Sequence, residues 1–227
     1  MQEAPAITTR TTDVAQALRL EILTGRRLPG ERVQLEGLKQ DYGVSLSPIR
    51  EGLSRLVAEG LLIPSGQRGY RVAPVSTEEF LDIKAQRIDL EQKALRESIR
   101  LGGEDWEIAL MTAFQRLKNF EAKRWQADEI SAWEERHHIF HRTLISACGS
   151  PILMRFCELL HGMSDRYRRV LMKTSEPDRD VTQEHQALFD AALARNAKLA
   201  SEVLRTHIER TGDTVLRMMR EREQNQT

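Results

Sequence analysis

Residues 42–53, Tyr-Gly-Val-Ser-Leu-Ser-Pro-Ile-Arg-Glu-Gly-Leu, carry the pattern that decides the fold of the first third of this chain. Gly43 is suited to end one short helix, and Ser47 with Pro48 combines a helix cap with a first-turn proline, which predicts a new helix. Gly60 is expected to end that helix. Four apolar residues recur at helical spacing and form its buried stripe: Ile49, Leu53, Leu56 and Val57. The stretch therefore predicts a turn followed by an amphipathic helix with a polar outer face.

The flanking segments predict two earlier helices and a later hairpin. The first helix can be capped by Thr12 and stopped by Gly25, and the second falls within residues 35–43. After the third helix, two short extended runs within residues 61–73 flank the Gly-rich turn 65–69, which is typical of a β-hairpin. Three helices followed by a hairpin, in about 60 residues, is the order of a winged helix-turn-helix.

In that architecture the third helix enters the major groove of DNA and its polar face reads base edges. Arg50 can form a bidentate contact with guanine or bind a phosphate, and serines suit either. An ordinary solvated face with one arginine is the alternative for this helix taken alone, and the order of elements favours DNA binding. The residues expected at the DNA are Ser45, Ser47, Arg50 and Ser54 of the helix and Gln67, Arg68 and Gly69 of the turn.

Composition bounds the class of protein. The 227 residues hold 34 Lys+Arg and 34 Asp+Glu, so a uniformly basic nucleic-acid coat and an acidic tail are excluded, whereas a local basic face is not. Two cysteines are too few for a disulfide framework and favour a reducing compartment. The sequence has no signal-peptide pattern at its start and no stretch of about 20 apolar residues. We therefore expect a cytoplasmic protein with no membrane partner.

The distribution of prolines and charges predicts two domains, residues 1–75 and 76–227. Five of the seven prolines precede residue 75, and the first domain carries ten Lys/Arg against eight Asp/Glu. Beyond it the chain reads as six amphipathic helices with short connections, which predicts an antiparallel all-α bundle. The expected fold is thus mainly α: an N-terminal winged helix-turn-helix with a small β wing, and a C-terminal helical domain.

All six histidines lie in the second domain. His137 and His141 are four residues apart, so they share a helix face and can bind one metal ion. His185 and His207 each lie beside a buried stripe. Buried histidines are more often hydrogen-bonded core residues than ligands, so spacing alone leaves metal binding and a structural role both open.

Three segments of the first domain resemble the DNA-binding domain of GntR-type transcription regulators. They are Leu28-Pro-Gly-Glu-Arg-Val, the stretch 42–53, and Leu56-Val-Ala-Glu-Gly-Leu-Leu. At the position of Leu46 the family usually has an arginine, and at the position of Glu36 it commonly has another. Both of these arginines usually touch DNA. The resemblance implies a winged helix-turn-helix whose operator sequence or affinity differs from the family norm.

The second domain is similar, over about residues 77–215, to the FCD ligand-binding domain of the FadR-like branch of these regulators. The matching segments are Arg87-Ile-Asp-Leu-Glu91, Phe140-His141 with Cys148-Gly-Ser-Pro-Ile-Leu153, Glu184-His185 through Ala194-Arg-Asn196, and Thr206-His207. Metal-binding members hold a divalent ion, often zinc, with one aspartate and three histidines. This chain has His137 at the aspartate position, so the resemblance implies a site of His137, His141, His185 and His207, suited to zinc, nickel or a similar ion.

The resemblance also implies an effector, typically a small carboxylate. Arg87 occupies the position of a family arginine that can pair with a carboxylate, although an ordinary pair with Glu91 is the alternative. Further segments, among them residues 102–106, 136–141 and 166–168, resemble the glutarate-responsive repressors of this branch, which indicates a short dicarboxylate.

The function expected from these features is a homodimeric transcription regulator, a repressor more readily than an activator, that binds a palindromic double-stranded operator. A metal-dependent hydrolase that uses the histidines is the alternative. It is disfavoured because His137-His-Ile-Phe-His141 lacks the glutamate of the His-Glu-x-x-His motif. We therefore expect no enzymatic activity.

Overall fold

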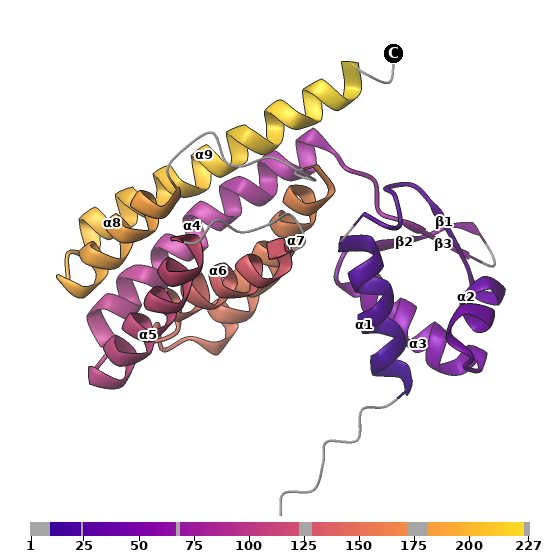
Figure 1. Ribbon diagram of the computed structural model, residues 1–227, viewed down its shortest axis with the longest axis horizontal. Helices are drawn as coiled ribbons and strands as arrows, with labels where there is room; N and C mark the ends of the chain where they lie inside the picture. The colour runs from indigo at the N-terminus through magenta and orange to yellow at the C-terminus, as the bar shows by residue number, and fades with distance from the viewer. Residues whose placement is uncertain (1–9, 24, 67–68, 123–128, 172–180, 225–227) are drawn as a thin grey trace, which may run out of the picture. The chain divides into compact units, whose positions relative to one another are not determined.

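The computed structural model describes residues 10–23, 25–66, 69–122, 129–171 and 181–224. The chain forms two compact units. The first comprises Met1–Glu79 together with Asp165–Leu171, and the second comprises Phe80–Ser164 together with Met172–Thr227. The fold is mainly helical, as the sequence predicted (Figure 1). Within the described residues, no helix is both long and apolar enough to cross a membrane.

The first unit is a winged helix-turn-helix, which confirms the expected fold. Its elements are α1 (Arg10–Leu23), β1 (Arg32–Gln34), α2 (Leu35–Tyr42), α3 (Leu46–Ala58), β2 (Leu62–Pro64) and β3 (Gly69–Val72). The strands form an antiparallel sheet in the order β1–β3–β2, in which Arg71 lies opposite both Arg32 and Ile63. Strand β1 was not predicted, because three residues are too few to show an alternating pattern.

Two helix starts differ from the prediction. Helix α3 begins at Leu46, and its N-cap is Ser45 with extended backbone (φ −73°, ψ 166°), so the assignment of Ser47 as the cap was wrong. Pro48 is tolerated in the first turn because the first N–H groups of a helix have no intrahelical partner. Helix α1 begins at Arg10, which precedes the start predicted at Thr12.

The apolar stripes of the first unit meet in one core. The largest fully buried side chains there are Leu18, Ile22, Leu38, Ile49, Leu53, Leu56 and Leu62. Arg71 supports the wing by donating to Ser65 Oγ (3.2 Å) and to the Gly30 carbonyl (3.0 Å). The core thereby fixes α3 against the sheet and leaves its polar face outward.

Arg166, in the last turns of α7 (Pro151–Leu171), is 3% exposed and lies in the first unit. Its guanidinium donates to the carbonyls of Gly60 (2.7 Å), Ala73 (3.1 Å) and Pro74. Burial lowers the pKa of Arg166 from its usual value. These bonds connect the segment after α3 to the segment after β3.

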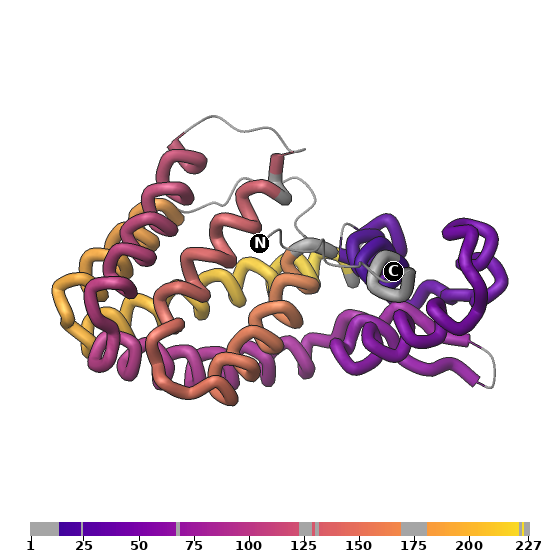
Figure 2. Tube along the Cα trace, turned by 90° about the horizontal axis from the view of Figure 1, so that it is seen from below, coloured from indigo at the N-terminus to yellow at the C-terminus, as the bar shows by residue number. Residues whose placement is uncertain are grey.

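The second unit is a helical bundle built from α4 (Thr77–Leu101), α5 (Glu104–Glu121), α6 (Ile130–Ile145), most of α7, α8 (Val181–Leu193) and α9 (Ala197–Gln224). Ser76 caps α4, since the Glu79 N–H donates to its Oγ (3.2 Å). Helices α4 and α9 are antiparallel neighbours, because Lys84 pairs with Asp213 and Gln92 with the Ser201 carbonyl (Figures 1 and 2). The predicted bundle is therefore observed.

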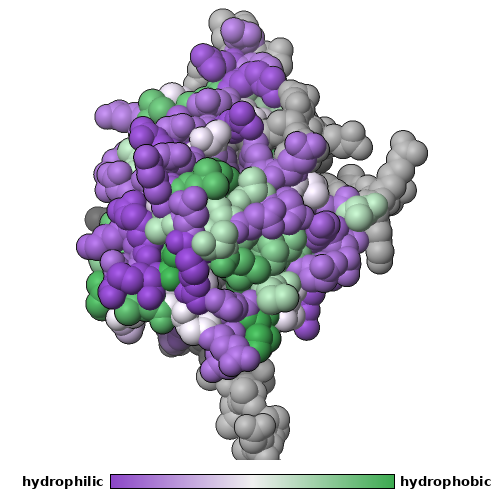
Figure 3. All heavy atoms as spheres, turned by 90° about the vertical axis from the view of Figure 1, so that its left-hand side faces the viewer, coloured by the Kyte–Doolittle hydropathy of each residue, from purple (hydrophilic) through white to green (hydrophobic). Residues whose placement is uncertain are grey.

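Much of the surface is hydrophilic, but some large apolar side chains remain exposed. Figure 3 shows a face on which hydrophobic side chains gather within a hydrophilic border. Helix α7 carries an exposed apolar stripe at helical spacing: Ile152 (60% exposed), Phe156 (54%) and Leu159 (41%). Such a stripe is typical of a surface that another chain covers.

Candidate functional site

A groove of about 1100 Å³ in the first unit lies beside the recognition helix α3. Three segments line it: the β1–α2 region, the outer face of α3, and the wing. The lining residues are Arg32, Val33, Gln34, Leu35 and Glu36; Leu46, Arg50 and Ser54; and Pro64, Ser65, Gly66, Gly69 and Tyr70. Recognition helix and wing thus border one hollow, as expected for a surface that meets a DNA duplex.

The groove presents two arginines for an anionic ligand. Arg32 and Arg50 are both exposed, and neither has an ion-pair or hydrogen-bond partner among the described residues. By contrast, Arg55 of the same helix pairs with Glu51 (2.7 Å). An unpaired arginine in a hollow beside a recognition helix can bind a phosphate or a guanine edge.

The predicted DNA-contacting residues divide into three groups. Arg50, Ser54 and Gly69 line the groove. Ser45 and Ser47 are exposed at the start of α3 but do not line it. Gln67 and Arg68 lie outside the described residues.

Of the thirteen lining residues, sequence reasoning assigned only Arg50, Ser54 and Gly69 to DNA, and Arg32, Gln34 and Tyr70 are among those that it missed. Arg32 and Gln34 lie on β1, which was unforeseen, and Tyr70 lies on β3 directly after the predicted turn. The Glu-Arg-Val run at residues 31–33 was the available signal.

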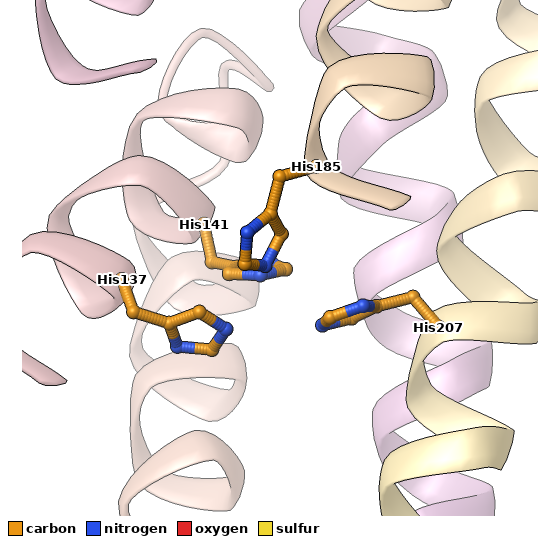
Figure 4. A group of neighbouring side chains, drawn as sticks. All are labelled: His137, His141, His185 and His207. Atoms are coloured by element: carbon orange, nitrogen blue, oxygen red, sulfur yellow. The ribbon is translucent and has the colours of Figure 1, made fainter. Parts of the chain in front are cut away.

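The second unit contains a buried cluster of four histidines, His137, His141, His185 and His207. Helix α6 supplies the first two from adjacent turns, α8 supplies the third and α9 the fourth. Figure 4 shows the four rings converging from these helices. One ligand nitrogen from each ring lies within 4.8 Å of the others. The structure thus brings together all four residues named from the sequence.

Two glutamates orient the rings of this cluster. His185 Nδ1 lies 3.1 Å from Glu121 Oε1, and His207 Nδ1 lies 2.8 Å from Glu184 Oε2. An ionised carboxylate only accepts hydrogen bonds, so each Nδ1 carries the proton and each Nε2 keeps its lone pair. Trp133 Nε1 also donates to Glu121 Oε1 (3.0 Å), and Arg210 donates to Glu184 Oε1 (3.1 Å). Sequence reasoning did not assign Glu121 a role.

The donor atoms fit a divalent metal ion. The Nε2 atoms of His141 and His185 are buried and have no hydrogen-bond partner among the described residues. A buried polar atom without a partner is costly, and a metal ion accepts such a lone pair. Burial, followed by the neighbouring histidines, holds the pKa of His141 well below its usual value, which keeps that ring neutral.

Arg87 lies in the bundle beside this cluster and is fully engaged. Its Nε donates to Glu91 Oε1 (2.7 Å), its Nη1 donates to Ser164 Oγ (2.9 Å), and its Nη2 lies 3.2 Å from His161 Nδ1. The pair with Glu91, which the sequence offered as the alternative to effector binding, is therefore present. The adjoining hollow, lined by Glu91, His141 and His161 among others, has a volume of only about 10 Å³. A small carboxylate would therefore have to displace some of these contacts.

Two protein families match this chain. The model of bacterial regulatory proteins of the gntR family matches residues 10–72, and the model of the FCD domain matches residues 82–210. The first covers the unit that holds the groove. The second covers the helices that hold the histidines.

Named relatives and solved structures agree with these matches. The HTH-type transcriptional regulator BphR of Paraburkholderia xenovorans is 41% identical over 86% of this chain and 80% of its own length. The HTH-type transcriptional repressor GlaR of Escherichia coli is 33% identical over 89% of this chain and 94% of its own length. The structure of Escherichia coli McbR/YncC superposes with a TM-score of 0.75 over 93% of this chain and 99% of that chain, at 20% identity, and so supports the fold.

These relatives are transcription regulators and not enzymes, which decides against the metal-dependent hydrolase. The His137–His141 segment accordingly belongs to a regulatory domain. The sequence matches to these two relatives extend over most of their length. The chain belongs to the gntR family of bacterial regulatory proteins and is a DNA-binding transcription regulator with an FCD domain.

Proposed function

We propose that this regulator is a homodimeric repressor whose binding to a palindromic operator responds to a small carboxylate in a metal-containing bundle. The observation that carries the DNA part is the groove with its two unpaired arginines, Arg32 and Arg50. A dimer presents two such grooves to two half-sites, since two-fold protein symmetry is matched by a palindrome.

Arg50 tests the DNA part. Arg50→Ala should weaken binding to a DNA duplex selected by the wild-type protein by about 1–3 kcal/mol, because one base or phosphate contact is lost. Arg55→Ala is the matched control, as Arg55 lies on the same helix but pairs with Glu51. Equal affinity of the Arg50 variant and the wild type in a gel-shift titration would remove α3 as the reading helix.

For the bundle, we propose a divalent metal ion, with zinc preferred and nickel or a similar ion possible. His137, His141, His185 and His207 would hold it, and the ion would supply a positive charge that binds an anion. The support is the set of converging nitrogens, two of them buried without a partner, together with the carboxylates behind His185 and His207. Because the four ligands lie on three helices, the ion would bind only the folded bundle and stabilise it.

The effector proposed for this site is a small carboxylate, with a short dicarboxylate preferred. One carboxylate of the effector would bind the Arg87 guanidinium and replace part of its contact with Glu91. That contact is a buried pair between residues four apart on the same helix. His161 lies between Arg87 and the histidine cluster, with its ring centroid 6.0 Å from that of His141. A ligand that spans Arg87 and the metal would therefore bridge α4 to α6, and its differential affinity would shift the balance between two dimer arrangements.

His185 tests the metal. His185→Ala should lower the metal content of the purified protein and reduce the thermal stabilisation by added zinc, while effector-free DNA binding stays near the wild-type level. Gln183→Ala on the same helix is the control, since Gln183 is exposed and belongs to neither group of candidate metal ligands. Metal analysis and thermal denaturation with and without chelator give the result. Wild-type protein without metal, and without a thermal shift on adding zinc, would contradict the proposal.

A further inference from the structure

Two further side chains line the groove together with Arg50: Glu36 and Leu46. We infer that both read base edges: Glu36 accepts a hydrogen bond from the N4 amino group of a cytosine, and Leu46 contacts the methyl group of a thymine. Each operator half-site would then carry these two bases near the guanine or phosphate bound by Arg50. The inference rests on the DNA-binding function and concerns which sequence is bound.

Glu36, Leu46 and Arg50 lie on one surface of the first unit. Leu46 is the first residue of α3 and Arg50 follows one turn later, so both project from the same face of the recognition helix. Glu36 is in the first turn of α2. All three line the groove that the wing closes on its other side. A duplex seated there would meet a cation, an anion and an apolar group together.

Leu46 is half-buried but does not belong to the core of its unit. The core cluster and the apolar residues packed against it include Leu35, Val44 and Val57, and they do not include Leu46. A leucine at the edge of a DNA-facing groove would otherwise leave apolar surface in water. In the major groove the apolar group that a base offers is the thymine C5-methyl, which makes thymine the base that Leu46 fits.

Glu36 is held by no strong partner. Its side chain is 71% exposed, and the one cation paired with it among the described residues is Lys39 at 3.9 Å, which is itself 53% exposed. Such a surface pair contributes little and does not withdraw the carboxylate from the groove. The carboxylate is therefore available to a base.

The chemistry of the carboxylate selects the base. An ionised carboxylate can only accept hydrogen bonds, and the phosphates around it repel it. Major-groove donors are the N4 amino group of cytosine and the N6 amino group of adenine, and the adenine amino group lies beside the N7 acceptor, which a carboxylate disfavours. Cytosine is therefore the base that offsets the cost of an acidic residue in the groove.

The experiment starts with in vitro selection from random double-stranded DNA by the full-length wild-type protein. Enrichment of a half-site establishes DNA binding, and failure to enrich any sequence would count against the DNA-binding function itself. With an enriched site in hand, affinities are measured for the wild type and for Glu36→Gln and Leu46→Ala on every single-base variant of one half-site.

We expect a cytosine position at which the wild type discriminates about 10-fold or more, as one good base contact does. Glu36→Gln should lose that discrimination or turn it toward adenine, whose N6 and N7 a glutamine amide matches. Replacing the key thymine by uracil, which removes only the methyl group, should weaken the wild type several-fold and leave Leu46→Ala unaffected.

Matched controls separate base reading from general charge and stability effects. Glu51→Gln makes the same change on α3 at an exposed residue that pairs with Arg55 and does not line the groove. Leu28→Ala removes an exposed leucine outside the groove. Neither control should alter base preference.

Two results would overturn the inference while DNA binding stands. Glu36→Gln could strengthen binding to all sequences equally with unchanged base preference, which would place Glu36 at the phosphates and not at a base. Alternatively, the wild type could bind uracil-substituted and thymine-containing sites equally, which would remove Leu46 from the reading surface.

Discussion

Replacing Arg166 by methionine should loosen the wing of the first unit. Arg166 is buried, and its guanidinium donates to the carbonyls of Gly60, Ala73 and Pro74. The Glu79 carboxylate attracts this charge, but no ion pair to Arg166 lies among the described residues, so the three carbonyls replace the lost hydration of the guanidinium. Methionine keeps much of the length of the side chain and removes every donor, which leaves three carbonyl oxygens without this partner.

The size of the effect follows from these contacts. A hydrogen bond to a charged group contributes about 1.5–3 kcal/mol, but bonds that share one guanidinium do not add fully. Methionine carries no charge, so the free-energy cost of burying the guanidinium is also removed, which partly offsets the loss of the hydrogen bonds. We therefore expect a loss of about 2–4 kcal/mol in the local free energy of opening, which corresponds to roughly 30- to 700-fold.

Amide hydrogen exchange is the suitable assay, because all three tryptophans lie beyond residue 100 and their fluorescence would not report on this unit. Two amides are informative. The Leu61 N–H donates to the Leu56 carbonyl (2.9 Å), and the Ala73 N–H donates to the Leu61 carbonyl (3.0 Å). Their exchange should accelerate by the factor given above in Arg166→Met. Arg155→Met on the same helix is the control, since Arg155 is exposed. Protection within twofold of the wild type in Arg166→Met would refute the reasoning.

Three further predictions concern the bundle. Burial holds the pKa of His141 well below 6.5, so below pH 6.5 the unfolded chain takes up a proton that the folded state does not. The free energy of unfolding of the metal-free protein should therefore stay constant in this respect above pH 6.5 and fall by at most about 1.4 kcal/mol per pH unit below it. Denaturant titrations of chelator-treated protein should show a smaller pH dependence in His141→Gln. Glu121→Gln should weaken zinc binding by about 10- to 100-fold in a competition titration. Glu104→Gln, at an exposed position of the same helix, is the control. Unchanged affinity in Glu121→Gln would mean that Glu121 does not orient His185. Phe156→Asp should raise the dissociation constant of the proposed homodimer by on the order of 10-fold or more in sedimentation equilibrium, whereas Leu199→Asp should not. An unchanged dissociation constant in Phe156→Asp would contradict an interface on α7.

The sequence alone determined the helices and the winged fold, because local signals report them. Ile49, Leu53 and Leu56 recur at helical spacing and are fully buried. Turn residues end the elements, as at Gly43, which takes a left-handed conformation (φ 62°). The i, i+4 spacing of His137 and His141 also predicted one shared helix face, since helical geometry brings such residues together.

Tertiary structure decided which distant groups meet. Strand β1 exists because β3 pairs with it, and three residues carry no pattern of their own. Glu121 lies 64 residues from His185 in sequence, so nothing local announces that its carboxylate fixes that ring. The same holds for Arg166, whose partners are about a hundred residues earlier in the chain. Helical periodicity is a property of neighbours in sequence. Long-range hydrogen bonds depend instead on how whole helices and strands pack. That packing is decided by many contacts together, and no short stretch of sequence contains them.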